Sequence, residues 1–288
     1  MSGGSRQRPT SGRRGSHTFS IGLITVDVTP LGVVIAGDSQ PVDMFAQHHV
    51  IYTQGKKTRA PIVRLYARDF TGFAAYVGTE KISGLATGDW LKNTLKSHYA
   101  SPLTDICELL ASTLTEAWTA SDTHLSIFVT GYEGTEPRFW YISNGDVPHP
   151  ATTAIPHTFE PVDNLGAAYA NEQAESAETL EAFVARKQPS YRRGVMAAAA
   201  IFDKFTTLIG ELMQDPEHPQ VAPLDTLDRY AAYVKFRFEF TKRVYDPEYG
   251  IGIDRHRPVD GNIHVYSVDP SGVPRVHPKH VGQSSVLK

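Results

Sequence analysis

Side chains that could carry out chemistry are few in this chain, and most lack the spacing that a site needs. The single cysteine, Cys107, cannot form an intramolecular disulfide, and it excludes a zinc site built from several cysteines. His48 and His49, like the other histidines, lack metal-ligand spacing with carboxylates. There is no glycine-rich phosphate loop and no Gly-x-Ser-x-Gly nucleophile turn. We therefore expect no metal and no cofactor.

A run of aromatic and basic residues in the C-terminal third is a second feature with chemical potential. It contains Tyr230, Tyr233, Phe236, Phe238 and Phe240 together with Lys235, Arg237, Lys242 and Arg243. Such a run could bind RNA, but at helical spacing it is more typical of a core or an interface. The aromatic residues are too closely spaced for one narrow stripe, so we expect a homo-oligomer.

The composition indicates a folded protein that does not bind nucleic acid over its whole surface. Of the 288 residues, 41% are hydrophobic and 20% are charged, which is sufficient for a packed core. The net charge is −3, whereas a protein built for nucleic acid is usually basic. No apolar run approaches the roughly 18 residues of a membrane span, and no signal peptide is apparent. We expect a cytoplasmic protein.

Residues 1–17 are expected to lie outside the fold, as a disordered tail or a propeptide. The segment is rich in Ser, Gly and Arg, and its apolar surface is too small to offset the entropy lost on ordering. A weak arm for nucleic acid or a partner is a further alternative. Residues 18–288 show no repeat and no linker, which predicts a single domain.

The elements of this domain alternate in groups. Strands are predicted at 18–28, 32–37, 62–66, 70–77, 125–132, 138–142, 262–269 and 273–276. Helices are predicted at 82–98, 104–120 with Thr104 as cap, 191–213 and 226–245. Residues 145–180 lack a clear pattern. Because the strands come as hairpins and the helices come in pairs, we expect antiparallel sheets in an order of helix, sheet, sheet and helix.

Several segments resemble proteasome β-type subunits, and most closely the bacterial HslV peptidase. Residues 33–40 (VVIAGDSQ) are similar to the family's second strand, and 18–22 (TFSIG) to its threonine-rich N-terminus. Weaker similarities lie at 55–57 (GKK), 125–132 with 138–141, and 260–266 with 269–272. The resemblance covers about residues 17–278. It implies an α+β fold, the four-layer αββα sandwich of the N-terminal nucleophile (Ntn) hydrolases, and assembly into rings beside an ATP-dependent unfoldase.

The same resemblance implies a chemistry and its residues. In this family a threonine attacks the amide, and its own α-amino group, with an unperturbed pKa near 8, acts as the base. Position by position, Thr18 is then the nucleophile, Asp38 the aspartate and Lys57 the lysine that the aspartate orients. The amine of Thr18 becomes free only if the bond between His17 and Thr18 is cut.

Each of these residues also has a structural interpretation. Thr18 could begin a strand, Asp38 could begin a turn, and Lys57 could belong to a solvated basic face with Lys56 as the register alternative. A symmetric hairpin would place Ser20 opposite Asp38, which makes Ser20 a second candidate nucleophile. Asp254 and Asp260 are candidates for a supporting aspartate near the C-terminus.

Three functions remain compatible with the sequence. The first is a threonine-type endopeptidase subunit that hydrolyses peptides or proteins in an oligomeric chamber. The second is a catalytically silent homologue that keeps the fold for assembly. The third is an Ntn amidohydrolase that acts on a small amide.

Overall fold

The computed structural model describes most of the domain, but not the first 16 residues. The described residues are 17–20, 23–38, 42–45, 49–52, 62–79, 81–118, 124–145, 158–173, 177–193, 196–214, 224–245 and 262–277. For 17–20, 42–45, 49–52, 196–199 and 212–214 it describes the backbone alone. The expected tail therefore lies outside the described residues, except for His17.

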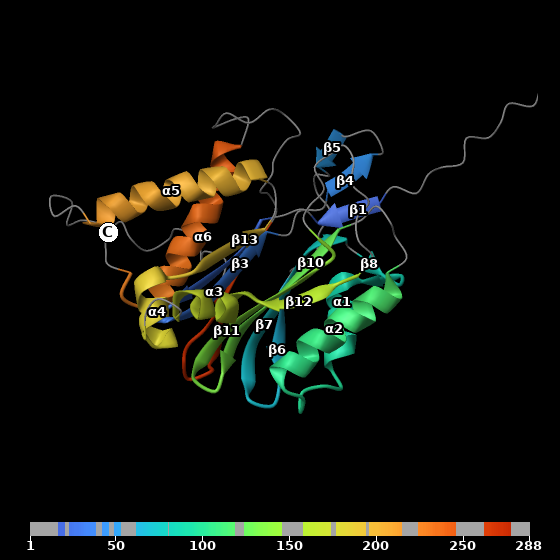
Figure 1. The fold of residues 1–288 in the computed structure, drawn as a ribbon. Coiled ribbons are helices and arrows are strands. Elements are labelled where there is room, and N and C mark those ends of the chain that lie inside the picture. The colour runs from blue at the N-terminus through green and yellow to red at the C-terminus, as the bar shows by residue number, and fades with distance from the viewer. Residues whose placement is uncertain are drawn as a thin grey trace, which may run out of the picture.

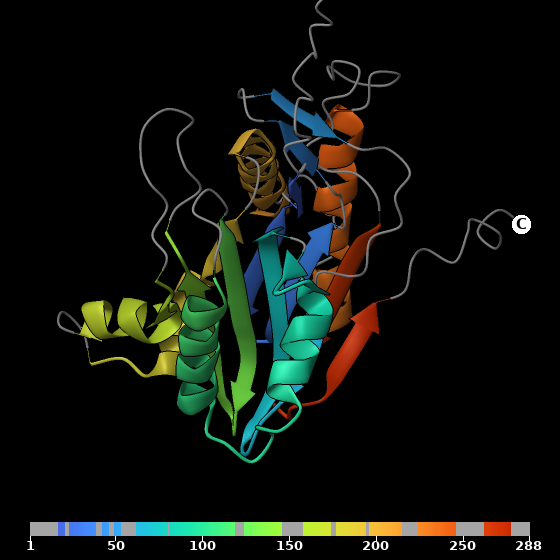
Figure 2. The ribbon, with the colours of Figure 1, turned by 90° about the vertical axis from the view of Figure 1, so that its right-hand side faces the viewer.

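The larger sheet, sheet A, has eight antiparallel strands (Figure 1). Its order is β12 (Glu160–Asp163), β11 (Glu136–Ser143), β10 (Leu125–Glu133), β7 (Phe70–Thr79), β1 (His17–Ser20), β4 (Val42–Phe45) and β5 (His49–Tyr52), and β6 (Ile62–Tyr66) also pairs with β7. The short strands β1, β4 and β5 lie beyond one end of the long strands (Figures 1 and 2).

The second sheet, sheet B, has five antiparallel strands. Its order is β13 (Ser190–Arg193), β2 (Ile24–Thr29), β3 (Gly32–Asp38), β14 (Ile263–Val268) and β15 (Pro274–His277). Every residue of β2 and β3 is buried, as expected for apolar strands covered on both faces. The predicted hairpins of β2–β3, β10–β11 and β14–β15 are confirmed.

The described residues form six helices. They are α1 (Thr87–Leu95), α2 (Leu103–Ala117), α3 (Asn164–Gln173), α4 (Leu180–Lys187), α5 (Met196–Gln214) and α6 (Leu227–Val244). Thr226 caps α6 by accepting a hydrogen bond from the Arg229 N–H. By contrast, α2 begins after Pro102 without a side-chain cap, so the predicted cap by Thr104 is wrong.

Helix α1 is shorter than the predicted helix over 82–98. The segment before it forms a two-stranded hairpin, β8 (Lys81–Ile82) and β9 (Leu85–Ala86), because Ser83 and Gly84 adopt positive φ angles of 48° and 81°. The helix begins only at Thr87, whose hydroxyl donates to the Thr79 carbonyl at 2.7 Å.

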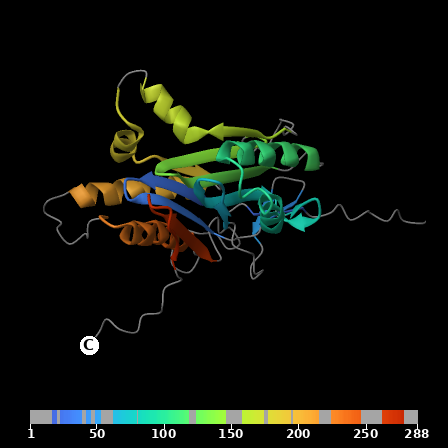
Figure 3. The ribbon, with the colours of Figure 1, turned by 90° about the horizontal axis from the view of Figure 1, so that it is seen from below.

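Three apolar cores hold the layers together. The first lies between α1, α2 and sheet A, the second lies between the two sheets, and the third lies between sheet B and α5 and α6. Helices α2 and α6 accordingly lie on opposite sides of the strands (Figure 3). Helix α3 packs on β11 while α4 contacts β2, and their Leu165, Phe183 and Val184 close one side of the core between the sheets.

These features correct the predicted four-layer αββα sandwich of the Ntn hydrolase type, which the described structure does not show. The fold is a mixed α/β arrangement of antiparallel sheets with six helices, and α3 and α4 lie along the side of the sheets. The predicted continuous strand over 18–28 is also wrong. Its first part, β1, pairs with β4 and β7 in sheet A, whereas β2 belongs to sheet B.

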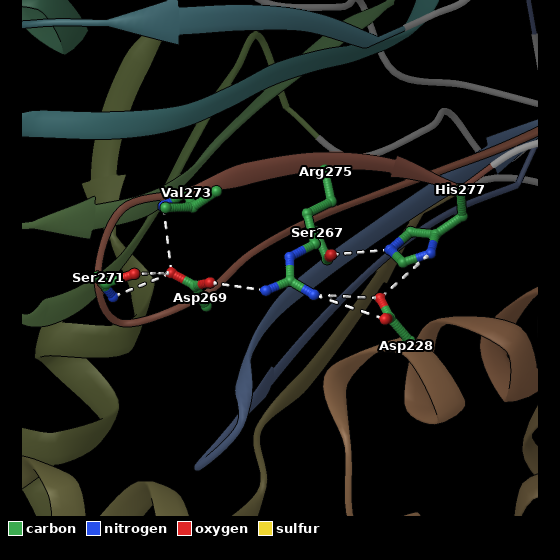
Figure 4. Close-up of polar contacts among 7 residues, drawn as sticks. All are labelled: Asp228, Ser267, Asp269, Ser271, Val273, Arg275 and His277. Carbon is green, nitrogen blue, oxygen red and sulfur yellow. Dashed lines mark hydrogen bonds and ion pairs between the residues drawn. The ribbon is translucent and has the colours of Figure 1, made fainter.

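The outer edge of sheet B is fixed by polar contacts on the β14–β15 hairpin (Figure 4). Asp269 accepts hydrogen bonds from the backbone N–H groups of Ser271 and Val273, and it pairs with Arg275 at 3.2 Å. His277 Nε2 lies 2.8 Å from the Ser267 hydroxyl. None of the helices in the described ranges is long and apolar enough to cross a membrane.

Candidate functional site

Asp38 is the predicted site residue that the structure describes most fully. It ends β3 in sheet B and is 1% exposed. Its Oδ1 accepts a hydrogen bond from the Leu23 N–H at 2.6 Å, and its own N–H donates to the Leu23 carbonyl at 3.3 Å. The carboxylate therefore ends the β2–β3 ladder at Leu23, so the chain before Leu23 is released to join the other sheet.

The candidate nucleophiles Thr18 and Ser20 lie on β1, where the structure describes the backbone alone. Thr18 is in register with Asp43 of β4, and Ser20 with Gly78 of β7. The proposed hairpin pairing of Ser20 with Asp38 is therefore wrong, since Asp38 pairs with Ile263 of β14. The two halves of the predicted site belong to different sheets.

Other predicted residues fall outside the described ranges. They are Lys57 and its register alternative Lys56, and the supporting aspartates Asp254 and Asp260. The pairing of Asp38 with Lys57 accordingly stays a prediction.

Between the two sheets the structure reveals a polar chain that the sequence analysis missed. Its hub is the buried Ser126 hydroxyl, which lies 2.8 Å from His124 Nε2, 2.8 Å from the Tyr141 hydroxyl and 3.1 Å from the Ser143 hydroxyl. Arg193 Nε, on β13, donates to the Tyr141 hydroxyl at 2.8 Å. We call these five residues the inter-sheet polar chain.

One proton arrangement makes every bond of the inter-sheet polar chain. The Ser143 proton goes to the Gly145 carbonyl at 2.7 Å, so Ser126 must donate to Ser143. The Tyr141 hydroxyl and His124 Nε2 must then donate to Ser126, while Tyr141 accepts from Arg193. His124 Nε2 therefore carries a proton.

The two ends of the inter-sheet polar chain lie next to strands that carry the predicted site residues. Arg193 is in register with Ile24, the neighbour of Leu23, whose N–H is bound by Asp38. At the other end, the His124 carbonyl accepts the Thr79 N–H at 3.1 Å, and Thr79 is in register with Phe19 of β1. The polar side chains of this group thus lie on segments that neighbour, through the backbone, the strand of Thr18 and the residue bound by Asp38.

The sequence contains only a partial signal for the inter-sheet polar chain. His124 and Ser126 are two residues apart, which places them on one face of a strand. Two polar residues in an otherwise apolar strand do not by themselves predict a site. Tyr141, Ser143 and Arg193 join them through strand register and sheet packing, which no local spacing reveals. The adjacent Tyr191 stays protonated, because burial and then the charge of Asp163 raise its pKa to about 12.

A separate cavity of about 400 Å³ lies at the other end of β10, between β11, α3 and α4. Its lining includes Arg138, Leu165, Tyr169 and Glu178. Arg138 forms ion pairs with Glu133 at 3.0 Å and Glu136 at 2.8 Å, and Glu178 pairs with Arg186. Each of these charged side chains is already paired within the protein, so we assign no ligand to this cavity.

Comparison with known proteins gives distant structural similarity only. No family model and no curated protein matches the chain. Anbu, the ancestral beta-subunit, from Yersinia bercovieri is 14% identical, with 88% of this chain and 86% of that chain covered and a TM-score of 0.47. A Gly-1 mutant of Anbu from Hyphomicrobium sp. strain MC1 is 12% identical, with 89% and 86% covered and a TM-score of 0.46.

These comparisons correct the family assignment drawn from the sequence. The short motifs predicted a proteasome β-type, HslV-like Ntn hydrolase, but no family model matches the chain, so the HslV-like assignment is not confirmed. The two solved structures named above are Anbu proteins. Motifs of five to eight residues were too short to distinguish between families at such low identity.

Proposed function

We propose that the chain is a subunit of a proteasome-related homo-oligomer that hydrolyses peptide bonds, with Thr18 as the nucleophile. In this proposal Asp38 and Lys57 form the supporting charged pair. The substrate is a peptide or an unfolded protein, which an ATP-dependent unfoldase in the cytoplasm supplies.

The observation that carries the proposal is the place of the Asp38 carboxylate. It is buried, and it binds the Leu23 N–H five residues after Thr18. A buried carboxylate favours a nearby cation, and the cation in turn favours a neutral amine base and stabilises an oxyanion. Asp38 is thus able to hold a lysine in its charged form beside the segment that leads from Thr18 into β2.

The proposed reaction needs a free amine on Thr18. After the bond between His17 and Thr18 is hydrolysed, the α-amino group takes the proton of the Thr18 hydroxyl as its oxygen attacks the amide carbon. The protonated amine then gives that proton to the leaving nitrogen, and water hydrolyses the acyl-threonine ester.

One observation favours a second candidate, a catalytically silent subunit of such an assembly. His17 is in register with Met44 and Thr18 with Asp43, so the bond between His17 and Thr18 lies inside a paired strand. Cleavage there would cut a paired strand, whereas a silent subunit keeps this strand whole.

The first test is the intact mass of the protein and its turnover of fluorogenic peptides, with Thr18→Ala compared against Ser20→Ala. We expect the native protein to lose residues 1–17, and we expect Thr18→Ala to retain them and to lose turnover by at least 100-fold, since the nucleophile is then absent.

Ser20→Ala is the matched control, because it removes a hydroxyl from the same strand. Equal turnover in Thr18→Ala and the unmodified sequence would exclude Thr18. A native protein that keeps its first 17 residues and cleaves no peptide would support the silent subunit.

A further inference from the structure

The inter-sheet polar chain begins where β7 pairs with β1. Gly78 of β7 has a φ of 122°, which favours glycine, and a Cβ there would lie 2.1 Å from the His124 carbonyl oxygen. The next residue, Thr79, donates its N–H to that same oxygen at 3.1 Å. Both residues of β7 are in register with β1, Gly78 with Ser20 and Thr79 with Phe19. The backbone of His124 therefore fixes the part of β7 that pairs with β1.

The side chain of His124 is in turn held by the hub of the polar chain. Its Nε2 donates to the Ser126 hydroxyl at 2.8 Å. Ser126 also accepts from Tyr141 at 2.8 Å and donates to Ser143 at 3.1 Å. These three hydrogen bonds are all that a hydroxyl can make. Because Ser126 is fully buried, bulk water does not replace a partner that is lost.

Tyr141 is the residue at which the polar chain crosses from sheet A to sheet B. Its hydroxyl accepts from Arg193 Nε at 2.8 Å, and the Arg193 guanidinium lies 5.2 Å from the centroid of the Tyr141 ring. Arg193 is in register with Ile24 of β2. The residue before Ile24 is Leu23, whose N–H is bound by Asp38. The Tyr141 hydroxyl thus binds a side chain from the sheet of Asp38 and a side chain from the strand next to β7.

We propose that Tyr141 is a positioning residue, whose hydroxyl fixes β1, and with it Thr18, relative to the Asp38 carboxylate. The inference rests on the proposed function, in which Thr18 and Asp38 act together. The two residues belong to different sheets, so their separation depends on how the sheets lie against each other. Apolar contacts have no preferred direction, whereas a hydrogen bond fixes a distance and an angle. A polar chain across the core therefore sets a position that apolar packing alone leaves adjustable.

A neighbouring tyrosine separates positioning from packing. Tyr191 and Tyr141 both pack against the core between the sheets, and the Tyr191 ring is stacked on Phe139 with centroids 4.0 Å apart. The Tyr191 hydroxyl is buried, but within the described ranges it makes no hydrogen bond. Tyr191 therefore contributes its ring, whereas Tyr141 contributes a ring and a hydroxyl that both accepts and donates.

The experiment compares Tyr141→Phe with its matched control Tyr191→Phe, each in the full chain. Hydrogen exchange is followed by mass spectrometry on peptides that contain residues 18–20 and 78–79. We expect Tyr141→Phe to accelerate exchange there about tenfold, while exchange in α6 stays unchanged and Tyr191→Phe has no effect. In peptide turnover, Tyr141→Phe should lower kcat about tenfold or more with little change in KM, because the reacting groups are displaced while the contacts with substrate remain.

A second variant, Ser126→Ala, removes the hub and should accelerate exchange at residues 18–20 in the same way. Unchanged exchange in both variants would overturn the positioning role, whether or not the protein is active. Equal effects of Tyr141→Phe and Tyr191→Phe would assign the change to packing and would also overturn it, as would an unchanged kcat in a protein that cleaves peptides. A native protein that cleaves no peptide would overturn the proposed function alone, since the exchange rates still decide whether Tyr141 fixes β1.

Discussion

At the scale of single residues, Asp38 has a structural role that can be separated from a catalytic one. Its Oδ1 accepts the Leu23 N–H, and an asparagine in its place keeps an acceptor oxygen while it loses the charge. An alanine loses both. The two substitutions therefore distinguish the hydrogen bond that ends the β2–β3 ladder from the negative charge that the proposed lysine needs.

We expect Asp38→Asn to reduce peptide turnover strongly with a small change in KM, since a charge that acts on the transition state affects kcat. Lys57→Ala should reduce turnover at least as much, and the double variant should lose no more than the worse single variant. Asp38→Ala should in addition lower the free energy of unfolding by about 1–3 kcal/mol, because it leaves the Leu23 N–H buried without its acceptor. Additive losses in turnover would identify Asp38 as a turn residue.

At the scale of elements, the β14–β15 hairpin contains a histidine whose protonation affects the edge of sheet B (Figure 4). The pKa of His277 is lowered, first by burial, while Asp228 raises it and Arg275 and Lys235 lower it. Its Nε2 lies 2.8 Å from the buried Ser267 hydroxyl, which donates to it when Nε2 is unprotonated. Protonation replaces that acceptor with a second donor.

Because the folded protein binds this proton less readily than the unfolded chain, stability falls as the pH drops through the ordinary histidine pKa near 6.5. We expect the melting temperature to fall between pH 7.5 and pH 5.5, and to fall less in His277→Gln, whose amide oxygen still accepts from Ser267 but does not titrate. His98→Gln, a half-buried histidine in the turn after α1, is the matched control. An acid-induced decrease of the same size in His277→Gln would exclude His277 as its source.

At the scale of the whole molecule, a buried ion pair joins sheet B to both of its covering helices. Asp27 of β2 binds Arg237 of α6, with 1% and 2% of the two side chains exposed. Arg237 also donates to the Thr206 hydroxyl of α5 at 3.0 Å, and its guanidinium lies 4.4 Å from the centroid of the Phe202 ring. Asp27 further accepts from the Ser190 hydroxyl of β13.

Removal of one partner leaves the other charge buried and unpaired. We expect Arg237→Met to lower the free energy of unfolding by about 3–5 kcal/mol in urea titrations. Adding Asp27→Asn removes the orphan charge, so the double variant should be more stable than Arg237→Met alone. A double variant whose loss equals the sum of the single losses would show that the pair does not act as a unit.

The sequence by itself determined the local elements. Apolar runs bounded by turn residues predicted β3, β7 and β10, and apolar side chains at helical spacing predicted α2 and α6. Both signals are local, because they follow from backbone geometry. It did not predict α3, which lies within residues 145–180, or α4, which begins at Leu180. Helix α3 has no continuous apolar stripe that would reveal it in the sequence, and Leu165 is its buried residue. Its stability therefore comes from packing on β11.

Tertiary structure alone decided which sheet each strand joins and which polar side chains meet. A symmetric hairpin would have placed Ser20 opposite Asp38, but β1 joins sheet A, because Leu23 gives its N–H to the Asp38 carboxylate and the chain before it leaves sheet B. Arg193 and His124 meet through Tyr141 and Ser126, although Arg193 lies far along the chain from the other three. Such contacts depend on strand register and on the packing of one sheet against the other, and the free energies that set them arise from residues distant in sequence.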